Sequence, residues 1–290
     1  MERVYVTGAR GMVGKALLPV FSGMFEVRGT DLPEVDVTDA DAVGRDIAGF
    51  APRIIIHLAS MTDVDGCELD PEAARAVNVT GTANVAEAAS ASGASMVYLS
   101  TGMIYNGKKT APYIEYDRPD PVNVYGRTKY EGELEIGRRL DRYYIFNTCW
   151  IFGGGRADKK FVARILEIAG ESGKLRVVSD KYGSPTYTVD LARAIRSLIG
   201  PGSGDLPYGR YHLVNRGCAS RFEVAAEIVR AAGLDGIEIE PVSSDAFDLP
   251  APRPDMEAMS SYRLDIMGLG SMRGWKEALG DYITGLIGEG

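Results

Sequence analysis

Residues 4–14 read Val4-Tyr5-Val6-Thr7-Gly8-Ala9-Arg10-Gly11-Met12-Val13-Gly14, four strand-favouring residues followed by three glycines at intervals of three. A glycine at the end of a strand permits a tight turn. A second glycine allows backbone N–H groups to approach a pyrophosphate at the N-terminus of the following helix, where the helix dipole favours negative charge. The third glycine allows that helix to pack close to the sheet. The stretch therefore predicts a site for a nucleotide cofactor.

An acid placed further along the chain supports this prediction. Asp31 follows Gly11 by 20 residues, at the end of a second strand-like segment, and an acid at this spacing binds the ribose hydroxyls of a dinucleotide. Asp31 repels a 2′-phosphate and so favours NADH, whereas Arg10 in the glycine loop is able to bind that phosphate and favours NADPH. We therefore expect the chain to use NADPH or NADH.

Strands and helices alternate regularly through the first half of the chain. Apolar strands are expected at 53–58, 95–100 and 143–147, and helices are expected at 40–50, capped by Asp39, and from Pro71 to about residue 89. This alternation predicts an α/β fold with a Rossmann-type doubly wound parallel sheet. Residues 1–150 would form the dinucleotide-binding domain.

After residue 150 the alternation is less regular. A basic helix is expected near 159–169, short strands at 175–178 and 211–214, and helices at 189–199 and 221–232. We expect residues 151–290 to form a smaller C-terminal substrate-binding lobe, with some elements returning to the main domain. The lobe would cover the edge of the sheet where ligands of such folds bind.

Bulk properties limit the partners and the compartment. The net charge of −8 argues against nucleic acid and anionic membranes as partners. Cys67, Cys149 and Cys218 lie far apart, as is usual in a reducing compartment. With no leader-like start and no apolar run of membrane-spanning length, we expect a cytoplasmic protein. His57 and His212, the two histidines, lie in apolar runs and are expected in the core.

The chemistry is indicated by Ser100-Thr101, at the end of the fourth strand, together with Tyr125 and Lys129. Tyr and Lys four residues apart share one face of a helix. The ammonium should favour the phenolate and move the tyrosine pKa from near 10 toward the working pH. Tyr125 would then exchange a proton with a substrate oxygen while a hydride moves. A second copy, Tyr105 to Lys109, contains the turn dipeptide Asn-Gly and should not align on a helix.

These motifs resemble the extended short-chain dehydrogenase/reductase superfamily and, more narrowly, the dTDP-4-dehydrorhamnose reductase family. The residues that carry the narrower resemblance extend over nearly the whole chain in order. They are Asp36-Val37-Thr38-Asp39, Pro121-Val122-Asn123-Val124-Tyr125-Gly126-Arg127-Thr128-Lys129, Trp150-Ile151-Phe152-Gly153, Ser179-Asp180-Lys181-Tyr182-Gly183-Ser184-Pro185-Thr186-Tyr187 and Ala251-Pro252-Arg253-Pro254.

The resemblance implies reduction, by NADPH or NADH, of the C4 ketone of a nucleotide-linked 6-deoxy-4-ketohexose, most simply a dTDP-linked one, in L-rhamnose biosynthesis. Tyr125 would donate the proton, Lys129 would bind the nicotinamide ribose, and Thr101 would hydrogen-bond the reacting oxygen. The residues implied to bind the cofactor are Gly8, Arg10, Gly11, Met12, Val13, Asp31, Asp36, Val37, Leu58, Ala59, Ser60, Ser100, Tyr125 and Lys129. Those implied to bind the substrate are Thr101, Gly102, Trp150 and Arg253; core packing for Trp150 and a surface turn for Arg253 are the alternatives.

Two departures from the family pattern limit the prediction. Gly102-Met103 stands where the family usually has Asp-Tyr; the missing acid argues against a 4,6-dehydratase. Lys15-Ala16 stands where some bacterial members carry a glutamate that helps to hold magnesium at a dimer interface, so we predict no metal and leave a homodimer open.

Two other functions stay open. One is a non-catalytic scaffold resembling the regulatory subunit of methionine adenosyltransferase, and the other is a sugar-nucleotide epimerase.

Overall fold

The computed structural model describes residues 1–155, 161–201, 206–270 and 272–288. Its centre is a six-stranded sheet in the order β10-β5-β4-β3-β1-β2, in which every neighbouring pair is parallel. This arrangement confirms the predicted Rossmann-type α/β fold. The strands are β1 (Arg3–Thr7), β2 (Glu26–Thr30), β3 (Ile54–His57), β4 (Ser95–Thr101), β5 (Tyr143–Thr148) and β10 (Gly209–His212).

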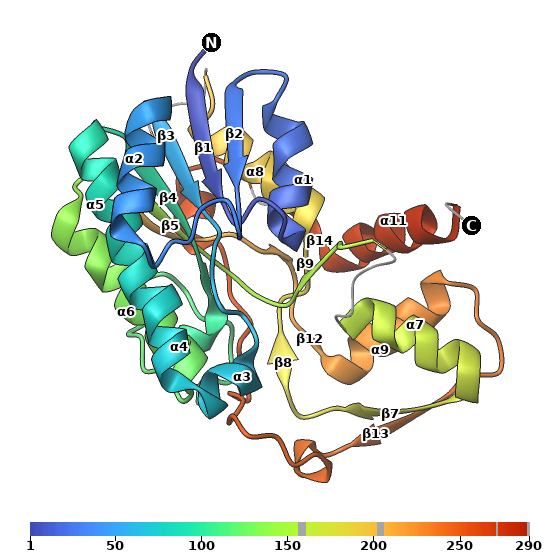
Figure 1. The fold of residues 1–290 in the computed structure, drawn as a ribbon. Helices are drawn as coiled ribbons and strands as arrows, with labels where there is room; N and C mark the ends of the chain where they lie inside the picture. Colours follow the sequence, from blue (N-terminus) through green and yellow to red (C-terminus); the bar gives the residue numbers. More distant parts are fainter. Residues whose placement is uncertain (156–160, 202–205, 271, 289–290) are drawn as a thin grey trace.

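Helices cover both faces of the sheet, as Figure 1 shows. Helices α1 and α8 lie on one face, and α2, α5 and α6 lie on the other. Because β3 is buried along its whole length, its side chains are apolar on both faces, which explains the unbroken isoleucine run that begins at Ile54. The helices of this domain are α1 (Met12–Phe21), α2 (Ala40–Phe50), α3 (Val64–Leu69), α4 (Pro71–Arg75), α5 (Thr82–Ser92), α6 (Val124–Arg139), α8 (Thr188–Ile199) and α10 (Tyr262–Ile266).

Local capping signals were sufficient to predict where two helices begin. Asp39 accepts a hydrogen bond from the backbone N–H of Ala42 at 2.9 Å, and Asp70 accepts one from Ala73 at 3.0 Å. The predicted helix from Pro71 to about residue 89 is observed as a continuous helical segment to Ser92, with a π-helical turn (Ala76–Gly81) between α4 and α5 that was not predicted.

The π-helical segment contains the buried Asn78. Its side chain accepts hydrogen bonds from Ser60 Oγ (2.7 Å) and from Met61 N (2.9 Å), and it donates one to Met61 O (3.1 Å). Asn78, in the widened helical turn, thus anchors the loop that follows β3. Such local widening often occurs near functional sites.

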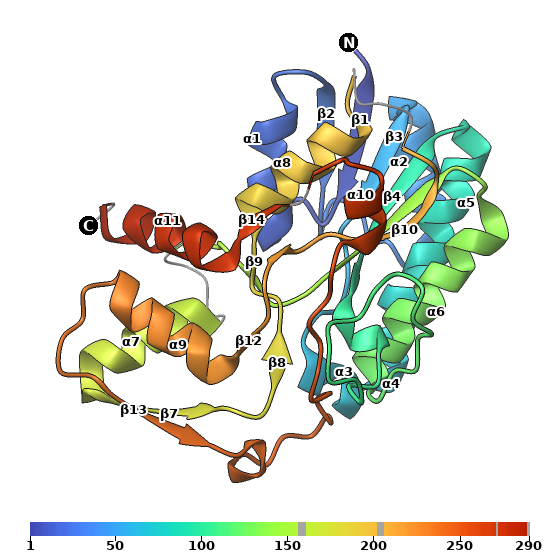
Figure 2. The same ribbon diagram turned by 180° about the vertical axis from the view of Figure 1, so that it is seen from behind.

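The second lobe has its own apolar core, beside the sheet domain (Figure 2). Strand β10 and helix α8 come from the second half of the chain yet belong to the sheet domain. The predicted basic helix is observed from Phe161; Lys159 and Lys160 are outside the described residues. The elements of the lobe are α7 (Phe161–Ser172), α9 (Arg221–Ala231), α11 (Trp275–Gly288), β6 (Ile151–Phe152), β7 (Lys174–Val178), β8 (Tyr182–Gly183), β9 (Thr186–Tyr187), β11 (Asn215–Arg216), β12 (Ala219–Ser220), β13 (Glu238–Val242) and β14 (Met272–Gly274). Within the described part of the chain, none of the helices combines the length and apolar character needed to cross a membrane.

Both histidines are buried, as predicted, and burial lowers the pKa of each to about 3. His212 contacts the hydroxyl of Tyr105 at 2.8 Å. Tyr105 and Lys109 lie on a turn in which Gly107 has φ +79°, and Lys109 forms an ion pair with Asp117 at 2.6 Å. The second Tyr-x-x-x-Lys copy is therefore not helical, which confirms the prediction for this segment.

Candidate active site

A cavity of about 720 Å³ opens at the carboxyl ends of β1, β3, β4 and β5. Ligands of doubly wound sheets bind at this edge, beside the point where the strand order reverses. The cavity brings together most of the predicted residues, from six separate segments of the chain. Those that line it are Gly8, Gly11, Met12, Val13, Asp31, Asp36, Val37, Leu58, Ala59, Ser60, Ser100, Thr101, Tyr125, Lys129 and Trp150.

The glycine loop fits a dinucleotide. A Cβ on Gly8 would lie 2.6 Å from Ala59 N, and one on Gly14 would lie 2.4 Å from Ala9 O, so no side chain is accommodated at either position. Helix α1 begins directly after this loop, and no side chain caps it at Gly11. Backbone N–H groups at such a helix end bind phosphate. On the same side, the buried hydroxyl of Thr148 lines the cavity and has no partner among the described residues.

Asp31 is held beside this loop. Its carboxylate accepts hydrogen bonds from Arg10 N and from Leu32 N, each at 2.9 Å. The guanidinium of Arg10 donates to Leu32 O at 2.9 Å and pairs with Glu34 at 2.5 Å, outside the residues that line the cavity. The structure therefore brings Asp31 to the cavity and directs Arg10 away from it, because Glu34 and a carbonyl oxygen engage its side chain.

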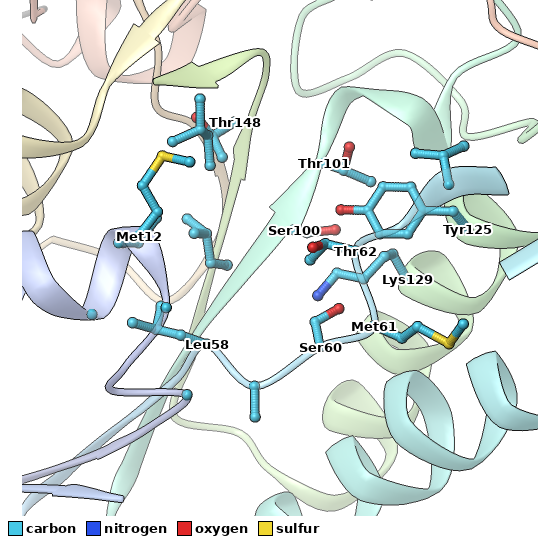
Figure 3. Close-up of a pocket in the computed structure, with 18 of the residues that line it drawn as sticks. Met12, Leu58, Ser60, Met61, Thr62, Ser100, Thr101, Tyr125, Lys129 and Thr148 are labelled. Carbon is cyan, nitrogen blue, oxygen red and sulfur yellow. The ribbon is translucent and has the colours of Figure 1, made fainter. Parts of the chain in front are cut away.

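The opposite wall carries the catalytic residues predicted from the sequence. Asn123 caps α6 by accepting a hydrogen bond from Gly126 N at 2.7 Å. A Cβ on Gly126 would lie 2.1 Å from Met103 O, so the start of α6 packs directly on the segment that follows β4. This contact places the hydroxyl of Tyr125 beside Thr101. Figure 3 shows both hydroxyls, with Lys129, facing the side of the cavity formed by Met12 and Thr148.

The pKa values in this wall differ from the expectation. Burial raises the pKa of Tyr125, and the hydrogen bond with Thr101 opposes this only in part. The predicted lowering by the neighbouring ammonium is therefore wrong for the protein alone, because desolvation of the phenolate is the larger effect. Burial also lowers the pKa of Lys129 to about 7, against the opposing effect of Glu133.

Glu133 lies one helical turn after Lys129 and is buried. It accepts hydrogen bonds from Ser100 Oγ at 2.5 Å and from Asn147 Nδ2 at 2.9 Å, and it pairs with Arg210 of β10. The carboxylate thus links α6, β4, β5 and β10 directly behind the predicted catalytic residues.

Two charged residues that line the cavity, Arg221 and Glu257, were not predicted from the sequence. They lie beside Trp150, and we call this part of the lining the outer wall of the cavity. Trp150 lines the cavity and donates from Nε1 to Glu257 Oε1 at 3.2 Å, while the Arg221 guanidinium lies 3.6 Å from the Trp150 ring centroid. Burial lowers the pKa of Arg221 and raises that of Glu257. The Ser220 and Glu223 capping box marks the start of α9 in the sequence, but no local signal gives the direction of the Arg221 side chain.

Two predicted substrate residues do not line the cavity. Gly102 is buried behind it, where a Cβ would lie 2.8 Å from Glu257 O, and Met103 lines the cavity in its place. The Arg253 guanidinium forms two hydrogen bonds with Asp65, at 3.0 and 2.8 Å, and is occupied by this ion pair. Their binding roles stay predictions. Among the described residues, no three His, Cys, Asp or Glu side chains are grouped so as to hold a metal ion.

Comparison with known proteins gives full-length matches. A family model described as RmlD substrate binding domain matches residues 1–287. The dTDP-4-dehydrorhamnose reductase of Mycolicibacterium smegmatis is 37% identical over 99% of this chain and 86% of its own length. A crystal structure of a dTDP-4-dehydrorhamnose reductase from Clostridium acetobutylicum superposes with a TM-score of 0.93 at 33% identity, covering 98% of this chain and 99% of that one. The Bacillus anthracis enzyme of the same name, solved in complex with NADP, gives 0.92 at 34% identity, with 98% and 99% covered.

Proposed function

Because the chain belongs to the dTDP-4-dehydrorhamnose reductase family, we propose that it reduces the C4 ketone of a dTDP-linked 6-deoxy-4-keto sugar with NADPH or NADH, in L-rhamnose biosynthesis. The observation that carries the proposal is the arrangement of Thr101, Tyr125 and Lys129 along one wall of a cavity whose other wall is the glycine loop. A ketone in this cavity would have a proton donor and a coenzyme on opposite sides.

Each catalytic residue has a distinct task. Bound NAD(P)H supplies the hydride. Tyr125 donates a proton to the ketone oxygen, and its raised pKa keeps the phenol protonated at neutral pH, the form that a reduction requires. Thr101 hydrogen-bonds both the phenol and the ketone oxygen and so aligns them. Lys129 binds the nicotinamide ribose and, when protonated, stabilises the negative charge that develops on Tyr125.

The two halves of the chain divide the binding. Residues 1–150 bind the coenzyme, through the glycine loop, Asp31 and the loop after β3. Residues 151–290 bind the sugar nucleotide, except for the elements that complete the sheet domain, β10 and α8. This division is supported by the cavity, which is lined on one side by the sheet edge and on the other by residues of the lobe such as Arg221 and Glu257.

An assay of coenzyme consumption tests the function. Purified protein, NADPH or NADH and dTDP-4-dehydrorhamnose are mixed, and the loss of absorbance at the reduced nicotinamide band is compared with the sugar product by chromatography. A reductase consumes one coenzyme for each ketone reduced. An epimerase forms product without net consumption, and a scaffold protein does neither; either result would reject the proposal.

Assembly and location are secondary proposals. We propose a homodimer in the cytoplasm; the three free cysteines support a reducing compartment. Light scattering coupled to size exclusion measures the oligomeric state directly, and fractionation of the producing cell measures the location.

A further inference from the structure

Arg221 is a charged residue for which the proposed mechanism has no use. It is the first residue of α9, and its side chain lines the cavity. Its guanidinium lies 3.6 Å from the ring centroid of Trp150 and 4.8 Å from that of Phe161. No side-chain hydrogen bond or ion pair of Arg221 is found within the described residues, although a guanidinium carries five N–H donors.

Two features make this position unfavourable for a cation in the free protein. Burial disfavours the charged form, as the lowered pKa of Arg221 shows. A cation in the first turn of a helix is opposed by the helix dipole. Arg221 is partly buried, and its donors have no protein acceptor within the described residues, so they stay open to a ligand in the cavity. Stacking on Trp150 offsets part of this cost. An anion in the cavity would supply acceptors and a counter-charge that offset both effects.

We infer that Arg221 binds the diphosphate of the sugar-nucleotide substrate, with Trp150 holding the guanidinium in place. A diphosphate offers several acceptor oxygens, and the planar fork of an arginine binds such groups with two parallel hydrogen bonds. This inference rests on the proposed function in one respect, that the occupant of the outer part of the cavity is a nucleotide sugar.

The location of Arg221 indicates that the diphosphate it binds belongs to the substrate and not to the coenzyme. The glycine loop already provides a phosphate site after β1, whereas Arg221 comes from the lobe and packs on Trp150. The capping box engages the backbone N–H groups of Ser220 and Glu223, and Arg221 N donates to Lys181 O at 3.3 Å, whereas the Arg221 side chain has no acceptor within the described residues. Glu257 opposes an anion here, but burial raises its pKa and its Oε1 accepts from Trp150.

The experiment is a titration calorimetry series with the full-length protein. The variants are Arg221→Gln, Arg221→Lys and, as a matched control, Arg176→Gln, which removes an exposed arginine of the same lobe that does not line the cavity. The probes are dTDP, UDP, GDP and ADP, then thymidine, which lacks phosphates, and NADH. Thermal unfolding of each variant verifies that it is folded.

We expect Arg221→Gln to weaken binding of the preferred nucleoside diphosphate by tenfold or more, and Arg221→Lys to weaken it by a smaller factor, because a lysine keeps the charge but loses the fork. Affinities for thymidine and NADH should stay within about twofold, and Arg176→Gln should match the wild type. Equal losses for thymidine and the diphosphate would assign Arg221 to packing and overturn the inference. Unchanged diphosphate affinity, or a wild type that binds none of the four diphosphates, would also overturn it. A wild type that binds dTDP through Arg221 but does not consume coenzyme would reject the proposed function alone.

Discussion

The ammonium nitrogen of Lys129 lies over the ring of Tyr98, 4.0 Å from the ring centroid. The face of an aromatic ring attracts a cation, but it replaces only part of the hydration that Lys129 loses in the buried wall of the cavity. The pKa of Lys129 is therefore lowered to about 7. Lys129, which we propose binds the ribose and assists Tyr125 as an ammonium, therefore has a pKa near neutral pH.

We predict that kcat/KM for the coenzyme decreases as the pH rises through about 7, because Lys129 is an ammonium below its pKa and a neutral amine above it. The parameter kcat/KM for the first substrate to bind reports the free enzyme, in which this pKa applies. The Lys129→Arg variant stays charged throughout and should lack this decrease, whatever its absolute rate. A wild-type profile that is flat from about pH 6 to 9 would contradict the assignment.

Replacing Tyr125 by phenylalanine should abolish most turnover while the coenzyme still binds. The change removes the proton donor but keeps the ring that packs at the start of α6, and loss of a general acid costs roughly 10²-fold to 10⁴-fold in rate. Steady-state rates and quenching of coenzyme fluorescence measure the two properties separately. Wild-type turnover in Tyr125→Phe would remove this residue from the mechanism.

The second Tyr-x-x-x-Lys copy supplies a control for that experiment. Lys109 pairs with Asp117 at the surface, away from the cavity, so Lys109→Ala should leave kcat and KM unchanged. Its unfolding free energy should fall by no more than about 1 kcal/mol, the usual limit for an exposed ion pair. A large loss of activity in this variant would show that the wrong copy had been identified as catalytic.

The buried carboxylate of Glu133 should matter chiefly for stability. In Glu133→Gln the paired Arg210, which is largely buried, keeps its charge without a counter-ion, and removing one partner of a buried pair typically costs about 3–5 kcal/mol. Urea unfolding measures this cost. The double variant Glu133→Gln with Arg210→Met should recover part of it, because no unpaired charge remains. Additive losses in the double variant would show that the two residues act independently.

Features encoded locally could be predicted from the sequence. The Asp39 and Asp70 caps depend on a few neighbouring residues, and the shared face of Tyr125 and Lys129 follows from their spacing on one helix. The alternation of strands and helices predicts the parallel sheet. The isoleucine run of β3 predicts a strand that is buried on both faces, because such a strand is apolar on both sides.

Features that depend on distant segments could not be predicted. Arg221 and Glu257 reach Trp150 only because the lobe folds over the sheet edge, and neither residue has a sequence signal for that contact. The rise in the pKa of Tyr125 follows from burial, which exceeds the effect of any neighbour that the sequence reveals. The π-helical segment could not be predicted either, because Asn78 is stabilised there by a hydrogen bond from a loop that lies 17 residues earlier in the chain.

Asp31 should set the balance between the two coenzymes. Its carboxylate lines the cavity and is fixed by two backbone N–H groups, whereas the Arg10 side chain is engaged by Glu34. A 2′-phosphate would approach a carboxylate, so Asp31→Ser should raise the ratio of kcat/KM for NADPH to that for NADH by roughly tenfold, about 1.4 kcal/mol. Glu34→Gln, which releases Arg10, should change the ratio in the same direction. An unchanged ratio in both variants would place the selection elsewhere.

Two glycine-to-alanine changes in helices distinguish close packing from helix propensity. Gly14 in α1 and Gly44 in α2 both gain from the higher helix propensity of alanine, worth up to about 1 kcal/mol. A Cβ on Gly44 would meet nothing within 4 Å, so Gly44→Ala should raise the unfolding free energy by about that amount.

A Cβ on Gly14 would lie 2.4 Å from Ala9 O, and backbone atoms must move to admit it. Gly14→Ala should therefore lower the unfolding free energy by roughly 1–3 kcal/mol, the usual cost of overpacking, and weaken coenzyme binding because the loop from Gly8 to Gly11 shifts with Ala9. Urea unfolding with and without NADH measures both effects. Equal stabilisation by the two changes would mean that the loop yields freely and that its glycines do not define the phosphate site.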